Sequence, residues 1–559
     1  MNRRAAPEQL PLDDALQAFR DAAAAAASAA FDIPAPDVTF EAPRRAEFGD
    51  FATNVAFSLA KAARRPPQAI ASEIVERLSD GLGLAGSFSS IEAVGGFINV
   101  RLAPAVWQAA VEKILHEGAR FGEAPPQNQR VSLEFGSANP TGPLVVVQGR
   151  SMSIGDTLAN AMRLRGYDVF TEWIINDAGG QLDALGRSLY ARYRQRFDPE
   201  FPFPQDGYPG EYLLPIARDI AERDGDRWTR ASEAEWLPHF AKAGRDRLVA
   251  EQQQTARRFG VEYDLWQSEA ELHETGKVRE GIERLRQLGL TYEQDGALFF
   301  RATQFGDDKD RVLLRRDGRP TYLAMDVAYH FLKLKQNDRV VDILGPDHHG
   351  YIGRIKGLAA ALGYPGHLDV AIAQQITLLR GGDQVSMSKR SGDIITLDEI
   401  VDEVGVDAAR FFFIMLAMES PLSFDLKLAV EKDNENPVYY VQYGHARIAS
   451  VLRRALPEDV GAAPTAPLAP LVHPAELALA RRLSEFPTVV AGVVEYLAPH
   501  RLARYARDVA SDFHQFYTEC KILTEERDLR IARLALCLAA KTVLARTLAL
   551  VGVSAPDSM

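Results

Sequence analysis

The stretch EFGSANPTGPLVVVQGR (Glu134–Arg150) decides the fold of the central part of this 559-residue chain. It predicts a strand over Val131–Phe135, a turn of Gly, Asn and Pro residues, and a helix that opens near Pro143. Such strand–turn–helix crossovers bind phosphate groups, because the free backbone N–H groups and the dipole of the helix attract anions. The stretch therefore predicts a parallel sheet with an anion site where the helix begins.

The same pattern continues along the chain, since strands alternate with helices from Arg130 to about Phe424. This alternation predicts a parallel sheet with helices on both faces. The candidate strands are Val131–Phe135, Asp168–Ile175, Arg339–Leu344 and Asp369–Ala373. An aromatic, proline-rich stretch, RFDPEFPFPQDGYPGEYL (Arg196–Leu213), and a charged helical segment interrupt the alternation, so we expect an insertion over about 196–290.

A first unit precedes this region. Helical periodicity over Leu10–Ala30 and Ala52–Leu82 and a strand within Gly95–Leu102 predict an α+β unit. A helix over Pro104–His116 closes the unit, and a Pro-rich linker follows over Phe121–Arg130.

From Leu426 onward the pattern is almost purely helical, interrupted by a Pro/Ala loop at Gly461–Pro470. Because 559 residues exceed what one hydrophobic core holds, we expect three domains: residues 1–125, 126–425 and 426–559.

The composition indicates an ordinary globular chain, with 47% hydrophobic and 25% charged residues. No apolar run reaches the length of about 18–20 residues that spans a bilayer, and the N-terminus lacks the features of a secretory signal. Cys520 and Cys537 lie far from any His cluster, so we expect free thiols in a reducing cytoplasm. A net charge of −12 speaks against a protein that coats nucleic acid, although it leaves room for a local basic face.

Several further motifs carry chemistry. They are EFGDFATNVAFSLAK (Glu47–Lys61), WIINDAGGQ (Trp173–Gln181), GALFFRATQFGDDKDRVLLRRDGRPTYLAMDVAYH (Gly296–His330), GPDHHG (Gly345–Gly350), SMSKRSGDIITLDE (Ser386–Glu399), NENPVYYVQYGHARI (Asn434–Ile448) and HRLARYARDVASDFHQFY (His500–Tyr517). Together with Glu134–Arg150 they resemble class I arginyl-tRNA synthetases, in the same order and over essentially the whole chain. The resemblance implies a multi-domain α/β fold: an N-terminal α+β module that binds the corner of tRNA, a Rossmann-like parallel-sheet class I catalytic domain, and a C-terminal all-α anticodon-binding bundle.

The resemblance also implies an activity. The family activates L-arginine with ATP to arginyl-adenylate and transfers the arginyl group to the 3′ end of arginine tRNA. ATP with Mg²⁺ is then a substrate complex, and no tightly bound cofactor or structural metal is expected. The implied partners are arginine tRNA, L-arginine and ATP, without a membrane, and the implied protein is a cytoplasmic monomer.

Recognition of arginine requires acceptors for a guanidinium group, which is a planar fork of five N–H donors. By resemblance, the arginine-binding residues are Glu134, Ser137, Asn139, Tyr322, Asp326 and Asp347. Glu134 and Asn139 would hold the α-amino group of the substrate, whereas Tyr322 and Asp326 would face its guanidinium. Their i, i+4 spacing places Tyr322 and Asp326 on one helical face; alternatively, either residue caps a helix or pairs with an arginine of the chain.

ATP handling is assigned by the same resemblance. The ATP-binding candidates are Thr141, Gly142, Pro143, Gln148, Gly149, Gly345, His348, Met387 and Lys389, and the catalytic candidates are Lys389, Gln148 and Ser388. Lys389 would supply a full positive charge to the departing pyrophosphate; the alternative is a solvated loop lysine. Adjacent histidines in one extended loop rarely share a zinc ion, so we expect Gly345–Gly350 to contact ribose or adenine.

Contacts with tRNA are expected on both flanking domains. The candidates are Asn54, Tyr439, Tyr440, Gln442, Tyr443, His445, Arg447 and Met559. Aromatic rings and donors of this kind form stacking surfaces for unpaired bases. For each aromatic residue, packing in a helical core is the alternative, and for Asn54 it is a capped turn.

One stretch of four residues differs from the sequence pattern of the family. A His-x-Gly-His tetrad binds the ATP phosphates in the family, whereas Val145, Val146, Val147 and Gln148 stand in its place. Loss of one hydrogen-bond donor to a transition state typically costs about 10²–10³ in rate, and a branched side chain at Val147 is expected to crowd the nucleotide. The alternative is that these residues are neutral and that Lys389 and the helix dipole compensate.

Two hypotheses follow from the tetrad. In the first, the chain is an arginine–tRNA ligase. In the second, it is a catalytically impaired synthetase that binds arginine or tRNA as a regulator or sensor. Activation for an acceptor other than tRNA is a third possibility, against which the C-terminal helical domain argues.

Overall fold

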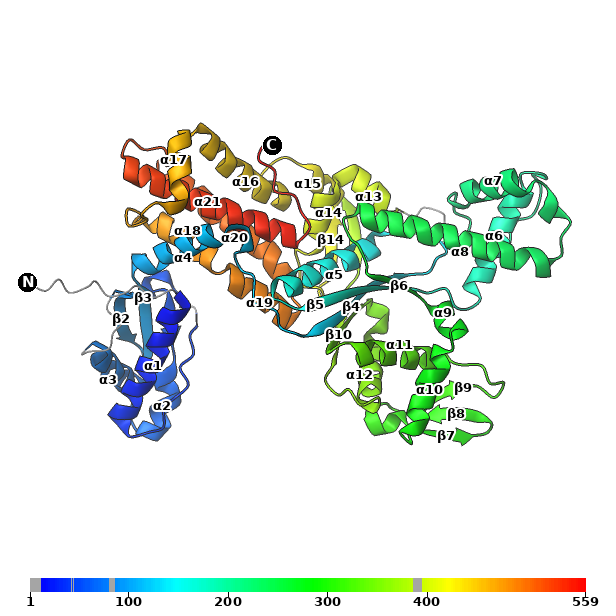
Figure 1. Ribbon diagram of the computed structural model, residues 1–559, viewed down its shortest axis with the longest axis horizontal. Coiled ribbons are helices and arrows are strands. Elements are labelled where there is room, and N and C mark those ends of the chain that lie inside the picture. Colours follow the sequence, from blue (N-terminus) through cyan, green and yellow to red (C-terminus); the bar gives the residue numbers. More distant parts are fainter. Residues whose placement is uncertain (1–11, 42, 44, 80–85, 386–394) are drawn as a thin grey trace, which may run out of the picture.

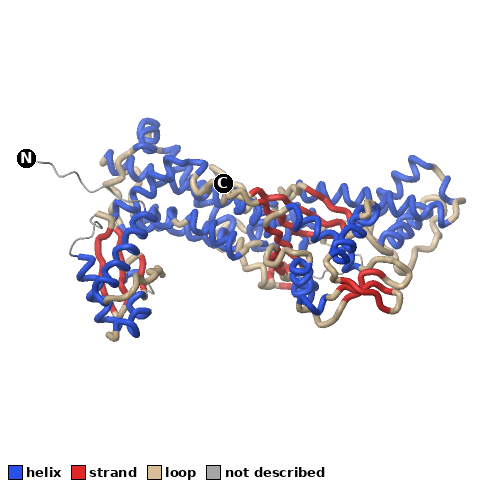
Figure 2. The backbone as a smooth tube through the Cα atoms, turned by 60° about the horizontal axis from the view of Figure 1, so that its bottom comes forward, coloured by secondary structure: helices blue, strands red, loops and turns tan. Residues whose placement is uncertain are grey.

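The computed structural model describes residues 12–41, 43, 45–79, 86–385 and 395–559 of the chain (Figure 1). It has an N-terminal α+β domain, a central domain built on a parallel sheet, and a C-terminal helical bundle, which confirms the predicted fold class. Figure 2 shows the strands of the central domain between the bundle at one end and a helical insertion at the other. Within the described residues, no helix is long and apolar enough to cross a membrane.

The N-terminal domain packs helices on a three-stranded antiparallel sheet. The sheet has the order β1 (Phe51–Thr53), β3 (Phe97–Leu102) and β2 (Phe88–Val94). Its helices are α1 (Leu12–Phe31), α2 (Val55–Ala63) and α3 (Pro67–Ser79). The helical stretch expected over Ala52–Leu82 is thus divided in two, because Arg64 adopts a left-handed conformation at φ 50° and prolines follow it.

The central sheet is parallel throughout, with the order β11–β10–β4–β5–β6. Its strands are β4 (Arg130–Ala138), β5 (Asp168–Ile175), β6 (Leu265–Ser268), β10 (Arg339–Leu344) and β11 (Leu368–Ile372). All four candidate strands are confirmed, and β6 is an addition. In Figure 1, α5 (Val146–Leu164) lies on one face of the sheet, whereas α11 (Tyr322–Gln336) and α12 (Ile352–Ala361) lie on the other.

The helix after β4 begins later than expected. α5 opens at Val146 and not near Pro143, because Val145 is extended. The carbonyl oxygen of Leu144 accepts a hydrogen bond from the Leu397 N–H at 2.8 Å, and Val145 forms an isolated antiparallel bridge with Thr396. A pairing with a segment some 250 residues later thus overrides the local helix signal.

Two satellite units lie before and after β6, and together they extend beyond the insertion expected over about 196–290. In the first, α6 (Gln181–Arg194), α7 (Leu213–Asp224) and α8 (Glu233–Arg258) enclose an aromatic core in which the Tyr190 and Trp236 rings stack at 3.8 Å. The second contains α9 (Glu269–Glu274), α10 (Lys277–Gln287) and an antiparallel sheet of β7 (Thr291–Gln294), β8 (Ala297–Phe300) and β9 (Arg311–Leu314).

A small mixed sheet connects the central domain to the bundle. Its strands are β12 (Ile376–Arg380), β13 (Asp383–Gln384) and β14 (Leu422–Asp425), and its helices are α13 (Leu397–Val404), α14 (Val406–Phe413) and α15 (Leu426–Val430). The Arg150 guanidinium is buried here and donates to four backbone carbonyls, those of Gln374, Gln375, Ala417 and Ser420.

The C-terminal bundle is entirely helical. It comprises α16 (Pro437–Arg454), α17 (Pro457–Ala462), α18 (Pro474–Ser484), α19 (Phe486–Tyr496), α20 (His500–Glu519) and α21 (Arg527–Leu550). Helix α4 (Pro104–Glu117) packs against α18 and α21 and so joins the N-terminal domain to the bundle. Cys520 and Cys537 are buried free thiols, as expected.

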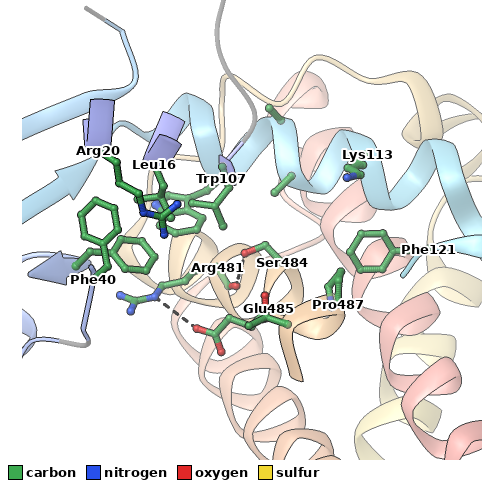
Figure 3. Close-up of a pocket in the computed structure, with 15 residues that line it drawn as sticks. Leu16, Arg20, Phe40, Trp107, Lys113, Phe121, Arg481, Ser484, Glu485 and Pro487 are labelled. Carbon is green, nitrogen blue, oxygen red and sulfur yellow. Dashed lines mark hydrogen bonds and ion pairs between the residues drawn. The ribbon is translucent and has the colours of Figure 1, made fainter. Parts of the chain in front are cut away.

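A cavity of about 370 Å³ lies where the N-terminal domain meets the bundle (Figure 3). Aromatic side chains, Phe40 and Trp107 among them, form its walls. At its edge, the Arg481 guanidinium donates to the Asp50 carboxylate at 3.0 Å and to the Asp50 carbonyl at 3.1 Å. These hydrogen bonds connect the N-terminal domain to α18.

Candidate functional site

The site lies at the carboxyl ends of the parallel strands. β4 stands in the middle of the sheet, and the chain fills one side with β5 and β6 before it returns to the other side with β10 and β11. Ligands of open α/β sheets bind where the strand order reverses in this way, outside the carboxyl ends of the strands. Here that point is the junction of β4 and β10.

A bulge shapes the end of β4. The pairing of β4 with β5 shifts register between Glu134 and Ser137, and Gly136 between them has φ +80°. A Cβ atom at Gly136 would lie 2.4 Å from the Trp173 ring, so only glycine fits. Beyond the bulge, Ser137 and Asn139 are exposed, whereas Glu134 before it is buried. The bulge thus directs these candidate residues to different surroundings.

The turn after β4 is held from the insertion. The Tyr212 hydroxyl donates to the Thr141 carbonyl at 2.6 Å, and burial raises the pKa of Tyr212 to about 12. The Gln252 amide of α8 donates to the carbonyls of Asn139 at 3.1 Å and Gly142 at 2.8 Å. Three carbonyls of the turn are therefore occupied, which fixes its backbone.

The altered tetrad occupies the end of this turn and the first turn of α5. The Val145 N–H donates to the Gln148 side-chain carbonyl at 3.2 Å, and the Gln148 amide donates to the Ser137 carbonyl at 3.4 Å. Val146 is fully buried, whereas Val147 is 38% exposed. Gln148 therefore acts as a helix cap, a role that an acceptor and donor side chain performs well at this position.

A cavity of about 860 Å³ opens beside the tetrad. One wall is the turn after β4, and the other is the Phe203–Tyr212 segment of the insertion. The site candidates that line it are Ser137, Asn139, Thr141, Gly142, Pro143 and Gln148. Val145 also lines the cavity, but Val147 is not among its lining residues. Gly149 is buried, and a Cβ there would meet the Leu397 side chain at 2.7 Å, so this glycine serves helix packing.

A group of carboxylates lies near the start of α11 and just after the ends of β5 and β6. Burial raises the pKa of Asp326, whose carboxylate also accepts a hydrogen bond from Tyr351. Burial, and then the charges of Asp326 and Asp177, raise the pKa of Glu269 to about 7. Asp177 pairs with Arg245 at 2.6 Å, whereas neither Asp326 nor Glu269 forms an ion pair within the described residues. Two carboxylates held together in this way suit a cationic ligand.

The other predicted arginine-binding residues differ in how far they are buried. Glu134 is buried and accepts a hydrogen bond from Lys333 at 2.6 Å. Tyr322 begins α11 and is 74% exposed, with its hydroxyl near Gly179. Asp347 and His348 are exposed in the short helix Pro346–Tyr351 that follows Gly345. Glu134 lies on β4 and Asp326 on α11, and the Lys333–Glu134 contact joins these two elements.

Three candidates, Met387, Ser388 and Lys389, lie outside the described residues. Thr396 and Leu397, which follow them in the chain, pair with Val145 and Leu144 at the start of the tetrad. Within the described ranges, no cluster of three His, Cys, Asp or Glu residues is arranged to hold a metal ion.

The tRNA candidates of α16 divide into two groups. Tyr439 and Tyr443 stack at 5.9 Å, and Arg447 lies over the Tyr517 ring at 4.4 Å, all partly exposed. Tyr440 packs against His514, whose pKa burial lowers to about 4.

Gln442 and His445, by contrast, are buried. They donate to the chain's own C-terminal segment, at the carbonyls of Ser554 (3.0 Å) and Pro556 (2.9 Å). A direct contact of these two residues with RNA would require that segment to move. Met559 and Asn54 are exposed.

Sequence reasoning missed Glu269, Lys333, His330 and Tyr212. Glu269 is the last residue of the stretch GVEYDLWQSE (Gly260–Glu269) and follows a strand too short to be recognised from the sequence. Lys333 and His330 follow Asp326 along one helix at the spacing that repeats one face, and that spacing was the available signal.

Comparison with known proteins covers all three domains. Residues 14–102 match the family described as arginyl tRNA synthetase N terminal domain. Residues 233–414 match the class I (R) tRNA synthetase catalytic domain, and residues 441–559 match the DALR anticodon binding domain. The order of the three agrees with the resemblance inferred from the motifs.

Whole-chain relatives agree with these matches. The arginine–tRNA ligase of Syntrophotalea carbinolica is 44% identical over 532 residues, which cover 94% of this chain and 95% of the relative. The arginine–tRNA ligase of Heliobacterium modesticaldum is 44% identical over 94% of each chain. The solved structure of Thermus thermophilus arginyl-tRNA synthetase shares the fold, with a TM-score of 0.75 at 23% identity, covering 97% of this chain and all of that one. The chain therefore belongs to the arginine–tRNA ligase family of class I aminoacyl-tRNA synthetases.

Proposed function

We propose that this protein is an arginine–tRNA ligase that uses ATP with Mg²⁺ as its second substrate. The observation that carries the proposal is the 44% identity, over 94% of the chain, to proteins with this activity. The two carboxylates of Asp326 and Glu269 support it independently, since they suit the guanidinium of arginine. We further propose that the protein is a monomer in the cytoplasm.

In the first step, a carboxylate oxygen of arginine attacks the α-phosphorus of ATP, and pyrophosphate leaves. The protein contributes mainly position and charge. Asp326 and Glu269 hold the guanidinium, with Tyr322 beside it, and Glu134, Ser137, Asn139 and Asp347 hold the α-amino end. The turn Thr141–Pro143, Gln148, Gly345, His348 and Met387 bind the nucleotide, while Lys389 and Ser388 stabilise the pyrophosphate.

In the second step, a hydroxyl of the 3′-terminal ribose of tRNA attacks the carbonyl carbon of arginyl-adenylate, and AMP leaves. Asn54 on the N-terminal domain and the partly exposed Tyr439, Tyr443 and Arg447 on α16 are the proposed RNA contacts. They lie on separate domains, which suits a long ligand that reaches both (Figure 1).

The altered tetrad is compatible with this activity in the structure. Gln148 keeps a polar side chain at the cavity, and Val147 does not line it. No observation favours the impaired alternative, so we retain the ligase as the single proposal. The dipole of α5 favours a phosphate at the N-terminus of this helix.

The test is charging of arginine tRNA with radiolabelled arginine by the unmodified chain and by a variant with Val145→His, Val147→Gly and Gln148→His. We expect the unmodified chain to charge tRNA. An inactive unmodified chain together with an active variant would refute the proposal and establish the impaired alternative. Lysine in place of arginine is the substrate control.

A further inference from the structure

Three carboxylates stand in one row across the centre of the sheet. Asp342 of β10, Glu134 of β4 and Glu172 of β5 occupy matching register positions on adjacent strands. All three are nearly inaccessible to solvent. Neighbouring buried carboxylates repel one another and lose their hydration, so the row requires cations or donors from another element.

Helix α11 supplies these groups from one face. The Lys333 ammonium donates to Glu134 at 2.6 Å and also to Asp342. The Tyr329 hydroxyl donates to Glu172 at 3.1 Å. Burial alone would lower the pKa of Lys333, but the charges of Asp342, Glu134 and Glu172 outweigh burial and raise it. Lys333 is therefore a permanent cation between two strands.

His330 is also a cation, for a geometric reason. Its Nε2 lies 2.9 Å from the Asp342 carboxylate, and its Nδ1 lies 2.8 Å from the Asp326 carbonyl oxygen. Both partners can only accept hydrogen bonds, so both ring nitrogens must carry a proton. Burial would lower the pKa of His330, but its hydrogen bond to Asp342 and the charge of Asp342 outweigh burial and raise it.

The two cations connect residues that the proposed function assigns to arginine. Lys333 holds the Glu134 carboxylate, and His330 holds the backbone of Asp326, while Asp342 accepts from both cations. Buried ion pairs can often be replaced by apolar residues without loss of stability, so stability alone does not account for this arrangement. A precise arrangement of binding groups does account for it, since small displacements of a bound substrate reduce rates strongly.

We propose that Lys333 and His330 are positioning residues, which set Glu134 on β4 and Asp326 on α11 at a fixed separation that fits bound arginine. The inference rests on the proposed function. It predicts that loss of either cation weakens arginine binding and leaves ATP binding intact, because the proposed ATP-binding residues Thr141–Pro143 and Gln148 line a cavity that neither Lys333 nor His330 lines.

Steady-state charging tests this with Lys333→Met and His330→Gln, each close to the original side chain in size. We expect the KM for arginine to rise about 10-fold or more, with the KM for ATP changed by less than about 2-fold. Arg533→Met is the matched control, because Arg533 forms a buried ion pair with Glu476 at 2.7 Å inside the bundle. It should lower thermal stability and leave the KM for arginine unchanged.

The pH profile supplies a second readout. As the pH rises through the pKa of His330, one of its two hydrogen bonds is lost, so the KM for arginine should rise at alkaline pH. The charged and titratable groups that face His330 are Asp342 of β10, Glu134 of β4, and Asp326, Lys333 and Tyr329 of α11. In His330→Gln this alkaline rise should be absent, because the amide does not titrate.

Equal changes in both KM values, or an alkaline rise that persists in His330→Gln, would overturn the inference. If Lys333→Met is insoluble, His330→Gln decides the matter alone, since it retains a donor toward Asp342. Failure of the unmodified chain to charge arginine tRNA would refute the proposed function. Normal charging with unchanged arginine KM in both variants would refute only the positioning roles.

Discussion

Glu269 should make arginine binding depend on pH. Its pKa is about 7 in the free protein, because it is largely buried and because Asp326 and Asp177 lie nearby. The guanidinium of arginine stays protonated throughout the physiological range, so it binds the ionised carboxylate. Arginine affinity must therefore fall as the pH falls through about 7.

The magnitude follows from the ionised fraction of Glu269. With a pKa of about 7, the apparent dissociation constant of arginine is multiplied by about 11 at pH 6 and by about 1.3 at pH 7.5. Affinity should thus change about 8-fold between these pH values. Asp326→Asn removes the charge that raises the pKa of Glu269 most among its neighbours. The loss of arginine affinity should therefore occur at lower pH in this variant. The substitution also removes a charge-assisted bond worth about 1.5–3 kcal/mol, so affinity at pH 7.5 should fall about 10- to 150-fold.

Isothermal titration of the full chain with arginine, in the absence of ATP and tRNA, measures these quantities. Titrations at pH 7 in two buffers of different ionisation enthalpy should show release of about half a proton per arginine. Glu269→Gln is the matched control, since it keeps the size of the side chain and cannot ionise. Its arginine affinity should be weaker and nearly independent of pH.

The reasoning fails if Glu269→Gln keeps the same pH dependence as the unmodified chain, because another group would then titrate. It also fails if no proton is released at pH 7. Citrulline, which carries a neutral group in place of the guanidinium, should bind weakly without proton release in both proteins.

Three further outcomes are expected. Gly136→Ala should destabilise the protein by roughly 2–5 kcal/mol in urea unfolding, because its Cβ would lie 2.4 Å from the Trp173 ring at a left-handed φ; an unchanged midpoint would contradict the bulge geometry. Tyr212→Phe removes the bond to the Thr141 carbonyl, worth about 0.5–1.5 kcal/mol, and should raise the KM for ATP a few-fold without affecting that for arginine. Arg447→Ala should weaken tRNA binding and lower the salt dependence of the binding constant by about one unit; an unchanged slope in filter binding would place the RNA elsewhere.

The strand pattern of the central domain followed from the sequence. Strands β5 and β10 begin and end at the predicted residues, Asp168–Ile175 and Arg339–Leu344. Continuous apolar runs between helical segments mark buried parallel strands, and that signal is local. β6 could not be recognised in this way, because it has only four residues, of which three are half-buried and one is buried.

Only some of the residues of the candidate site could be predicted from the sequence. Asp326 was assigned from a motif, but its partner Glu269 comes from the end of another strand, and no local pattern connects the two. The helix at the tetrad was expected near Pro143 and begins at Val146, because Leu144 and Val145 pair with Thr396 and Leu397.

The sequence by itself determined the order of the elements, the family and the types of residue at the site, because periodicity, turn residues and motifs are read over a few neighbours. The tertiary structure decided which of those residues meet. Lys333 and Glu134 lie 199 residues apart and bind at 2.6 Å. Such contacts depend on how α11 packs against the sheet, and the strength of each ion pair depends on its burial, which no stretch of sequence contains.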